Sequence, residues 1–522
     1  MKIIACLLSR LRRALLDLST ALRPHCFLSH FILIASSHAP LCASTPFRYS
    51  ICRFAAKGGV ATAVTPFLLA TTLTAQEPKT KNQKSGTSDA PRPNILIIFT
   101  DDQGYADLAC YGNEKNKTPR LDELAKEGTL FTSFYSQTVC GPSRSALLTG
   151  RQPRRSGGWS MPADEITWAE LIRDAGYQTA CVGKWDVSNR KPILERMPNA
   201  QGFDYFYGAL GANDGGTVKF HENNEAAGST DDMASLTRLY TEKSIEWLKD
   251  ERDPDKPFAL YLAHTMMHTV IDASEPFRGK SEGGLYGDVV EEFDYETGRL
   301  LDTLDELDLS ENTLVIYTSD NGPWNQPKYY LGKMGKGNGP KKRAEAWYQE
   351  PDTIFWGEAG PLRNGKGSCY EGGYRLPCLV RWPGQVPAGR TSDAIFATID
   401  FLPTFAALAG FSIPEDRHID GIDQTALLTG KSETGRNYFY FDKAGVRKGP
   451  WKYLKPDAHF FGYAIEDDRP KVAELYHLED DLGEKTNLAE KHPEKVAALA
   501  KLMAKIEDAE ALSKGADTGR IQ

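Results

Sequence analysis

The sequence predicts an α/β fold: a large domain whose mostly parallel central sheet lies between helices, followed by a small C-terminal α+β domain. Between residues 93 and 390, short apolar runs alternate with amphipathic segments, as in strand–helix–strand units. After residue 390, short strand-like runs typical of an antiparallel sheet take over. The length of 522 residues suits one large domain and a smaller one.

The expected elements follow from the spacing of apolar residues. The first strand, residues 94–100, is almost wholly apolar, as expected for a strand buried on both faces. The helix at 118–127 has Pro119 in its first turn, where proline is favoured. Further strands are expected at residues 177–182, 258–263, 313–318 and 378–381, and further helices at 167–175, 236–251 and 286–307. The C-terminal domain, residues 391–522, is expected to hold helices at 399–409 and 493–506 and strands at 438–442, 451–454 and 474–478.

The first 92 residues are predicted to be leader and linker. Within residues 1–75, an apolar run at 60–73 follows basic residues and ends in LTA, which resembles a signal-peptidase site. The run is too short to span a bilayer, so we expect an exported protein, periplasmic or secreted, without a stable membrane span. Residues 76–92 are expected to be a linker. Residues 1–50 hold a second basic-then-apolar pattern, so either translation starts nearer residue 51 or 60, or the leader is unusually long.

Charge and cysteine content exclude two classes of protein. The net charge of −8 shows no overall basic surplus, so nucleic acid is not an expected partner. Five of the nine cysteines follow residue 92, too few and too scattered for a disulfide scaffold. Cys369 and Cys378 could pair, and the sequence leaves this open.

Polar residues recur directly after the predicted strands. They are Asp101 and Asp102, Lys184, His264 and His268, and Asp320 and Asn321. Ligands bind at the carboxyl ends of strands in open α/β sheets, so we expect these side chains to form one site. Asp and Asn oxygens suit Ca²⁺ or Mg²⁺ better than Zn²⁺. A lone Asp-Asp pair is more often a turn or a helix cap, but the second pair favours a cation site.

Cys140 lies just before a predicted helix start, with Pro142 in the first turn and Arg144 one turn away. A helix N-terminus stabilises an anion, so the pKa of this thiol is expected to be lowered. The alternative is a buried structural cysteine beside a helix-start proline. The residue chemistry alone favours neither reading.

Residues 140–151, CGPSRSALLTGR, resemble the signature of type I sulfatases, and further family motifs follow in order. They lie at residues 100–104, 183–185, 257–268, 319–322, 361–373 and 474–487, so the resemblance covers about residues 93–488. It implies an alkaline-phosphatase-like sandwich that hydrolyses sulfate monoesters, with residues 93–390 as the catalytic domain. A sulfated carbohydrate is the expected substrate.

The resemblance also implies the reactive groups. Cys140 would be oxidised to formylglycine by a formylglycine-generating or anaerobic maturation enzyme, and its hydrated aldehyde would attack the sulfur. Arg144 would hold this residue beside a divalent cation, Ca²⁺ rather than Mg²⁺. The implied cation ligands are Asp101, Asp102, the modified Cys140, Asp320 and Asn321.

The remaining family residues would handle the sulfate and the leaving group. Lys184 and Lys366 would neutralise the sulfuryl oxygens. His268 is our candidate for the acid that protonates the leaving alcohol, with Lys366 as the competitor. The chain departs from the family at Asp186, where a histidine is usual. A carboxylate can accept a proton, but an anion beside sulfate repels it, so Asp186 acts as a base, points away, or binds the sugar.

Three further features carry weaker signals. The stretch 324–343 has six basic and no acidic residues, with Trp and Tyr interleaved. It lies between two site motifs, so it is expected either to border the site, where it would suit a polyanionic sugar chain, or to be a solvated insertion. His264 is expected either to be structural or to support the site residues from behind. His221 could contact substrate, but an exposed loop histidine is the favoured interpretation.

Two rival functions remain to be compared with sulfate-ester hydrolysis. A phosphatase or phosphodiesterase of the same fold is disfavoured by the Cys140 motif and by the lack of a histidine-rich two-metal set. A non-catalytic protein that binds sulfated glycans, with catalysis lost through Asp186, is disfavoured by the presence of the other site residues. The sequence leaves open the sugar, the sulfate position, endo or exo action and the oligomeric state.

Overall fold

The computed structural model describes residues 92–325, 356–458 and 471–517. The predicted leader at 1–75, the linker up to residue 91 and most of the basic stretch at 324–343 lie outside these residues. Within the described ranges, no helix combines the length and the apolar character needed to cross a membrane.

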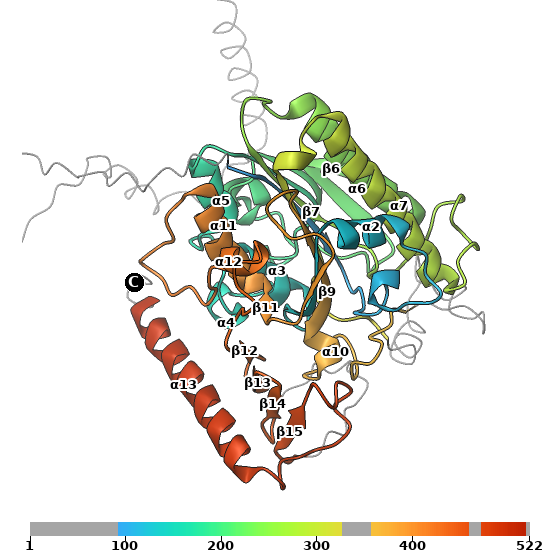
Figure 1. Cartoon of the computed structure of the whole chain (residues 1–522). Coiled ribbons are helices and arrows are strands. Elements are labelled where there is room, and N and C mark those ends of the chain that lie inside the picture. The colour runs from blue at the N-terminus through green and yellow to red at the C-terminus, as the bar shows by residue number, and fades with distance from the viewer. Residues whose placement is uncertain (1–91, 326–355, 459–470, 518–522) are drawn as a thin grey trace, which may run out of the picture. The chain divides into compact units, whose positions relative to one another are not determined.

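One mixed sheet forms the centre of the large domain (Figure 1). Among the described residues it has eleven strands, in the order β10-β2-β9-β8-β1-β7-β3-β4-β5-β6, with β11 beside β2. The run β8-β1-β7-β3-β4 is parallel throughout, so the carboxyl ends of these strands share one edge. The strands are β1 (Asn94–Thr100), β2 (Thr129–Tyr135), β3 (Gln178–Lys184), β4 (Tyr205–Ala209), β5 (Val218–Glu222), β6 (Glu225–Thr230), β7 (Phe258–Ala263), β8 (Thr313–Ser319), β9 (Arg375–Arg381), β10 (Arg390–Ser392) and β11 (Phe396–Ala397).

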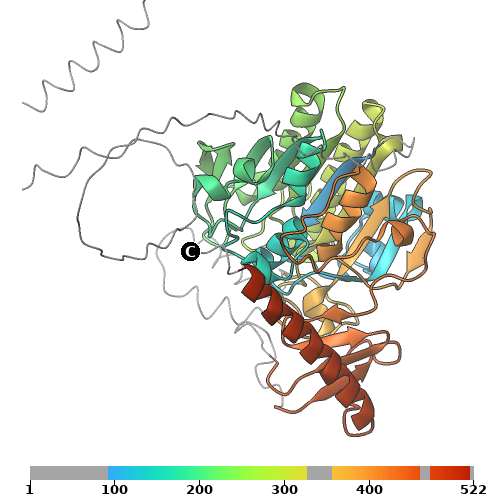
Figure 2. The ribbon, with the colours of Figure 1, turned by 90° about the vertical axis from the view of Figure 1, so that its left-hand side faces the viewer.

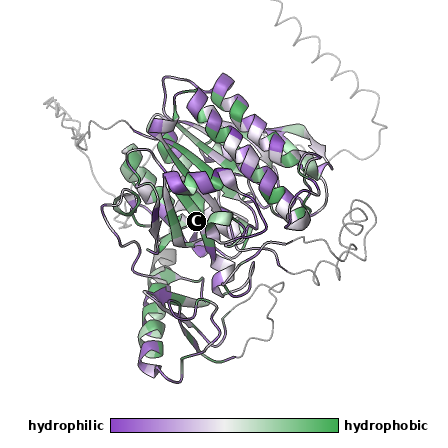
Figure 3. Ribbon diagram, turned by 45° about the vertical axis from the view of Figure 1, so that its right-hand side comes forward, coloured by the Kyte–Doolittle hydropathy of each residue, from purple (hydrophilic) through white to green (hydrophobic). Residues whose placement is uncertain are grey.

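The central strand β1 explains why helices cover both faces of the sheet. Leu96 and Ile98 pack into the core on one face, and Ile95, Ile97 and Phe99 pack into the core on the other. Side chains alternate between the faces of a strand, so a strand covered on both sides has a continuous apolar sequence. One face is covered by α2 (Pro119–Glu127), α6 (Leu236–Glu246) and α7 (Gly284–Glu306), and the other by α3 (Cys140–Thr149), α5 (Trp168–Asp174) and α11 (Phe401–Ala409). Figure 3 shows the apolar strands between helices with mixed surfaces.

A separate four-stranded antiparallel sheet forms the C-terminal part (Figure 2). It is built from β12 (Phe439–Tyr440), β13 (Gly445–Lys448), β14 (Trp451–Leu454) and β15 (Glu474–His477). The last helix, α13 (Pro493–Asp517), contributes Leu499 and Met503 to a core shared with Val446, Tyr453 and Leu475. The charged sequence of this helix therefore carries an apolar side that packs on the small sheet.

The large sheet continues past the boundary predicted at residue 390. Strands β10 and β11 pair in parallel with β2, and α11 lies against the face of that sheet. The four-stranded sheet starts only at Phe439. Strands of two or three residues leave no periodic pattern, so the sequence could not assign this segment.

Each expected helix and strand is present, although several differ in extent or direction. The strand expected at 378–381 is β9, which runs antiparallel between β8 and β2. The helix expected at 236–251 ends as α6 at Glu246 and continues as a π-helical turn, Trp247–Glu251. Strands β2, β4, β5, β6, β10, β11 and β13 were not predicted. The hairpin strand β6 is exposed along nearly its whole length, which removes the apolar alternation that identifies a strand.

Short helices fill the connections. They are α4 (Pro153–Ser156), α10 (Glu371–Tyr374), α12 (Thr425–Leu428) and the 3-10 turns Ala109–Tyr111, Leu194–Arg196, Pro198–Gln201, Met233–Ser235, Ser310–Asn312 and Thr398–Asp400. All five cysteines of the described residues are free thiols, so Cys369 and Cys378 do not pair.

Candidate active site

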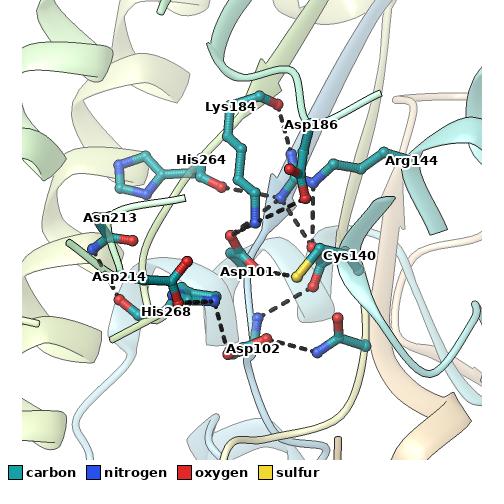
Figure 4. Close-up of polar contacts among 12 residues, drawn as sticks. Asp101, Asp102, Cys140, Arg144, Lys184, Asp186, Asn213, Asp214, His264 and His268 are labelled. Carbon is teal, nitrogen blue, oxygen red and sulfur yellow. Dashed lines mark hydrogen bonds and ion pairs between the residues drawn. The ribbon is translucent and has the colours of Figure 1, made fainter. Parts of the chain in front are cut away.

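The polar residues expected to form one site do come together, at the carboxyl edge of the parallel strands (Figure 4). Asp101 and Asp102 follow β1, Lys184 ends β3, His268 follows β7, and Asp320 and Asn321 follow β8. Their side chains are almost completely buried. Strand order decides this, because β8, β1, β7 and β3 are adjacent and parallel.

Cys140 enters this edge from the first turn of α3. Its Sγ lies 3.3 Å from Asp101 Oδ1 and 3.3 Å from Lys366 Nζ. The neighbouring glycine is required, because a Cβ on Gly141 would come within 2.2 Å of the Trp159 ring. The helix start therefore delivers the sulfur into the middle of the polar cluster.

The expectation of a lowered thiol pKa was wrong. Burial raises the pKa of Cys140 well above its ordinary value, and the carboxylate of Asp101 adds to this rise. Lys184 and Lys366 act in the opposite direction but do not outweigh the other two causes. A dry site beside an anion opposes a thiolate more strongly than the helix start favours it.

The donor set fits a hard cation. Single donor atoms from Asp101, Asp102, Cys140 and His268 all lie within 4.8 Å of one another. Asp102 Oδ2 and Asn321 Oδ1 are buried and accept no hydrogen bond from the protein. Buried oxygens normally accept hydrogen bonds, so these two unpaired oxygens indicate that a ligand binds there. Carboxylate and amide oxygens are the ligands of Ca²⁺ and Mg²⁺.

Asp320 shows the electrostatic consequence of crowding carboxylates. Burial raises its pKa to about 8, and Asp101 contributes further, although the Arg144 guanidinium opposes the rise. Asp320 Oδ1 accepts a hydrogen bond from the Asp102 backbone N–H at 3.2 Å. Buried carboxylates this close together favour a cation between them.

Two lysines supply positive charge from opposite sides. Lys184 Nζ lies 2.5 Å from Asp101 Oδ2, and Lys366 Nζ lies 2.5 Å from Asp102 Oδ1. Both side chains are buried, so neither is a solvated surface cation. The Lys366 backbone N–H donates to the carbonyl of Pro323 at 3.0 Å, which ties its segment to the end of β8.

Arg144 joins three strand ends. Its guanidinium donates to Asp320 Oδ2 at 3.0 and 3.2 Å, to the Lys184 carbonyl at 2.9 Å and to the His264 carbonyl at 3.4 Å. The side chain is completely buried. Arg144 therefore fixes the ends of β8, β3 and β7 relative to α3, which carries Cys140.

The family model described as Sulfatase matches residues 93–411. The chain belongs to the sulfatase family. A second model, described as N-sulphoglucosamine sulphohydrolase, C-terminal, matches residues 364–511. This sulfatase is therefore a type I, arylsulfatase-like sulfuric ester hydrolase, and the rival functions are set aside.

Individual relatives agree with the family. N-acetylgalactosamine-6-sulfatase of Canis lupus familiaris is 34% identical over 68% of this chain and 70% of that protein. N-acetylgalactosamine-6-O-sulfatase of Bacteroides thetaiotaomicron is 31% identical over 81% and 94%. The solved structure of the PsFucS1 sulfatase from Pseudoalteromonas sp. superposes with a TM-score of 0.67 at 25% identity, over 82% of this chain and 91% of that one. The sulfatase has the expected alkaline-phosphatase-like α/β fold.

The histidines of the sulfatase differ in kind. His268 Nε2 faces Asp102 Oδ2 at 3.8 Å and Asp214 Oδ1 at 3.5 Å, and its Nδ1 lies 2.6 Å from the Thr269 carbonyl. His264 turns its ring away from the cluster (Figure 4) and packs between Tyr240 and Phe293. Burial lowers the pKa of His264 to about 3, so its ring is neutral. His264 is a structural residue, which is one of the two roles expected from the sequence.

His221 does not lie in a loop. It belongs to β5, where it pairs with Gly208 of β4. The sequence placed it in a polar loop because the alternation in this edge strand is weak.

Asp186 lies beside Lys184 rather than pointing away. Its Oδ2 is 3.6 Å from Lys184 Nζ, and its Oδ1 accepts a hydrogen bond from Arg190 Nε at 2.7 Å. Arg190 and Asp214 were not predicted as site residues. Asp214 precedes two glycines, a pattern that does not distinguish a site residue from an ordinary turn.

Proposed function

We propose that this sulfatase hydrolyses sulfate esters on a carbohydrate, with a formylglycine made from Cys140 as nucleophile and Ca²⁺ as the cation. The observation that carries the proposal is the position of Cys140 Sγ, 3.3 Å from both an aspartate oxygen and a lysine nitrogen in a buried site. The proposed substrate class is supported by relatives named as N-acetylgalactosamine-6-sulfatases. It is also supported by a related solved structure described as a complex with neocarrahexaose, at 27% identity and a TM-score of 0.64.

The proposed cation ligands are Asp101, Asp102, the modified Cys140, Asp320 and Asn321. The unpaired oxygens of Asp102 and Asn321 support this set. Oxygen donors of this kind favour Ca²⁺, with Mg²⁺ as the second candidate. When bound, the cation would supply positive charge that polarises the sulfuryl group and the nucleophile.

Formylglycine would supply a hydrated aldehyde oxygen that attacks the sulfur in line with the departing alcohol. A separate maturation enzyme would oxidise the Cys140 thiol to the aldehyde. The raised pKa of the thiol agrees with this proposal, because a cysteine held as a neutral thiol is a poor nucleophile itself.

The other residues bind, orient and move protons. Lys184 and Lys366 would hold the sulfate oxygens from two sides and offset the charge that develops as the ester bond breaks. Arg144 would keep the nucleophile in line by fixing α3 to the strand ends. His268 presents Nε2 to the site, because its Nδ1 faces the Thr269 carbonyl. We assign it the proton that the leaving alcohol needs, with Lys366 as the alternative donor.

Mass spectrometry of the peptide that contains Cys140 tests the proposal, using protein purified from the native host. We expect the thiol sulfur to be replaced by an aldehyde oxygen, and sulfate to be released from sulfated mono- or oligosaccharides. The peptide that contains Cys181, another buried cysteine, serves as the internal control and should keep its thiol. An unmodified Cys140 in active enzyme would contradict the proposal.

We also propose that residues 1–75 are removed during export. The support is the apolar run and the LTA site described above. N-terminal sequencing of the protein recovered outside the cytoplasm should start close to residue 76. A start within residues 1–60 would contradict this.

A further inference from the structure

The most unusual feature near the sulfate lysine is a buried carboxylate. Asp186 is completely buried, and its Oδ2 lies 3.6 Å from Lys184 Nζ without a hydrogen-bond partner. Lys184 already pairs with Asp101 at 2.5 Å. A second anion in this position would weaken the attraction of Lys184 for sulfate unless another cation offset it.

Arg190 provides that cation. Its Nε donates to Asp186 Oδ1 at 2.7 Å, and its Nη1 donates to Asp214 Oδ2 at 3.2 Å. Asp214 Oδ1 in turn lies 3.5 Å from His268 Nε2. Charges of alternating sign therefore run from Lys184 through Asp186 and Arg190 to Asp214, which lies against His268.

The backbone holds this arrangement in a strained turn. Asp186, Asn189 and Arg190 all have left-handed conformations, with φ of 54°, 57° and 56°. Residues other than glycine rarely adopt this conformation, and it persists where the surroundings enforce it. On its other side the Arg190 stem packs on Gly211, where a Cβ would come within 3.0 Å of Arg190 Cδ.

We propose that Arg190 is a positioning residue of the sulfate site, which neutralises Asp186 and holds Asp214 against His268. The inference rests on the proposed function in so far as Lys184 and His268 are the residues that bind and protonate the substrate. This role of Arg190 explains how a carboxylate can lie beside Lys184. The Asp186–Arg190 pair is neutral as a unit, so an aspartate can occupy the place of the family histidine without repelling sulfate.

The arrangement predicts a specific double-mutant pattern. Arg190→Gln leaves Asp186 beside Lys184 without its partner, so we expect the affinity for inorganic sulfate to fall by about 10- to 100-fold. Asp186→Asn alone should change it less. The double variants Asp186→Asn/Arg190→Gln and Asp186→His/Arg190→Gln should recover most of the loss, because they also remove the unbalanced carboxylate.

The measurement is calorimetric titration of the full chain, in the presence of CaCl₂, with sodium sulfate. KM and kcat on a sulfated monosaccharide are determined in parallel, and KM should rise more than kcat falls in Arg190→Gln. In the proposed site Lys184, Lys366 and the cation hold the sulfate oxygens, so sulfate binding should not require formylglycine. A wild-type chain that binds sulfate but releases none from esters would therefore contradict the proposed function alone.

Arg278→Gln is the matched control. Arg278 pairs with Asp272 at 2.6 Å, and the exposures of the two side chains, 49% and 9%, resemble the 45% and 0% of Arg190 and Asp186. Arg278→Gln should leave sulfate affinity unchanged.

If Arg190→Gln does not fold, Arg190→Lys keeps the charge and should bind sulfate within about threefold of wild type. The inference is overturned if Arg190→Gln binds sulfate as tightly as wild type, or, where Arg190→Gln does not fold, if Arg190→Lys binds sulfate more than about tenfold more weakly than wild type. It is also overturned if the double variants are as weak as Arg190→Gln.

Discussion

Two clusters of buried charge in this sulfatase contain residues that are only five positions apart in sequence, Lys366 and Glu371. The site cluster contains Lys366 with Asp101, Asp102 and Cys140. The joint cluster contains Glu371 with Lys452 and Glu484, and it connects the segment after Lys366 to the small C-terminal sheet. Both are almost completely buried. The two clusters differ in how closely a cation or a hydrogen-bond donor approaches each carboxylate oxygen.

In the joint cluster every carboxylate oxygen of Glu371 and Glu484 faces a cation or a donor. Lys452 Nζ lies 3.0 Å from Glu371 Oε1 and 2.8 Å from Glu484 Oε1. Tyr135 donates to Glu371 Oε2 at 2.6 Å, and the Glu371 backbone N–H donates to Glu484 Oε2 at 2.6 Å. In the site cluster Asp102 Oδ2 accepts no hydrogen bond, and His268 Nε2 lies 3.8 Å from it, compared with 2.8 Å between Lys452 Nζ and Glu484 Oε1. Buried charge with close partners joins parts of this fold, whereas buried charge without a close partner indicates a ligand site.

The largest expected effect comes from removing the proposed nucleophile. Cys140→Ala should reduce kcat for sulfate release by about 10⁴-fold or more. The free energy of unfolding should change by about 1 kcal/mol or less, because alanine leaves the neighbouring charges in place. Sulfate-release kinetics and urea denaturation on the same preparation measure both. Cys110→Ala removes a partly buried thiol outside the site cluster and should retain activity. A similar loss of kcat in this variant would contradict the role assigned to the site cluster.

The joint cluster should show the opposite pattern. Lys452→Met leaves two buried carboxyls without their cation, so we expect a loss of about 3–5 kcal/mol in the free energy of unfolding. Molecules that remain folded should still release sulfate. The control is Lys455→Met just after β14, where the partner Asp457 is 81% exposed and the pair should contribute about 1 kcal/mol or less. Equal losses for the two lysines would contradict the assignment of the joint cluster.

Removal of the cation should affect the site cluster selectively. At a Ca²⁺ concentration about 100 times Kd, binding stabilises the folded state by about 2.7 kcal/mol. Chelation should therefore lower the thermal midpoint and abolish sulfate release, and added Ca²⁺ should restore both better than Mg²⁺. Asp102→Asn should remove this response, while Lys452→Met should keep it. A chelator shift that persists unchanged in Asp102→Asn would place the cation elsewhere.

The smallest expected effect is a pH dependence of the joint cluster. Burial raises the pKa of Glu484 to about 7, and the Glu371 carboxylate adds to this, although Lys452 opposes it. Above pH 4.5 the unfolded chain has lost this proton while the folded chain keeps it until about pH 7. The contribution of Glu484 to stability is thus largest below pH 4.5 and is lost as the pH rises through about 7.

Urea denaturation at pH 5 and pH 8 measures this change. The contribution should be on the order of 2 kcal/mol, since one pKa unit corresponds to about 1.4 kcal/mol. The pKa of Glu371 is lowered to about 2, because Lys452 and Arg375 outweigh the effect of burial, so Glu371 stays ionised over this range. Glu484→Gln should flatten the slope whatever its effect on absolute stability. An unchanged slope would assign the proton to another group.

Much of the site could be predicted because its residues follow strands that the sequence reveals. The apolar runs that became β1, β7 and β8 end directly before Asp101, His264 and Asp320. Parallel neighbours then bring these ends to one edge. Arg190 and Asp214 lie in irregular connections instead, and nothing in their local sequence shows that they reach Asp186 and His268.

The sequence by itself determined the identity of the family, four of the five strands of the parallel run (β8, β1, β7 and β3) and the residues at their carboxyl ends. These properties depend on local patterns: continuous apolar runs, the polar residues that follow them, and one contiguous motif around Cys140. The tertiary structure alone decided the direction of β9, the extension of the large sheet beyond residue 390, and the environment of each charge. The raised pKa of Cys140 and the pairing of Asp186 with Arg190 depend on burial and on partners distant in the chain. No local pattern contains that information, because electrostatic interactions in a dry interior are set by which segments the fold brings together.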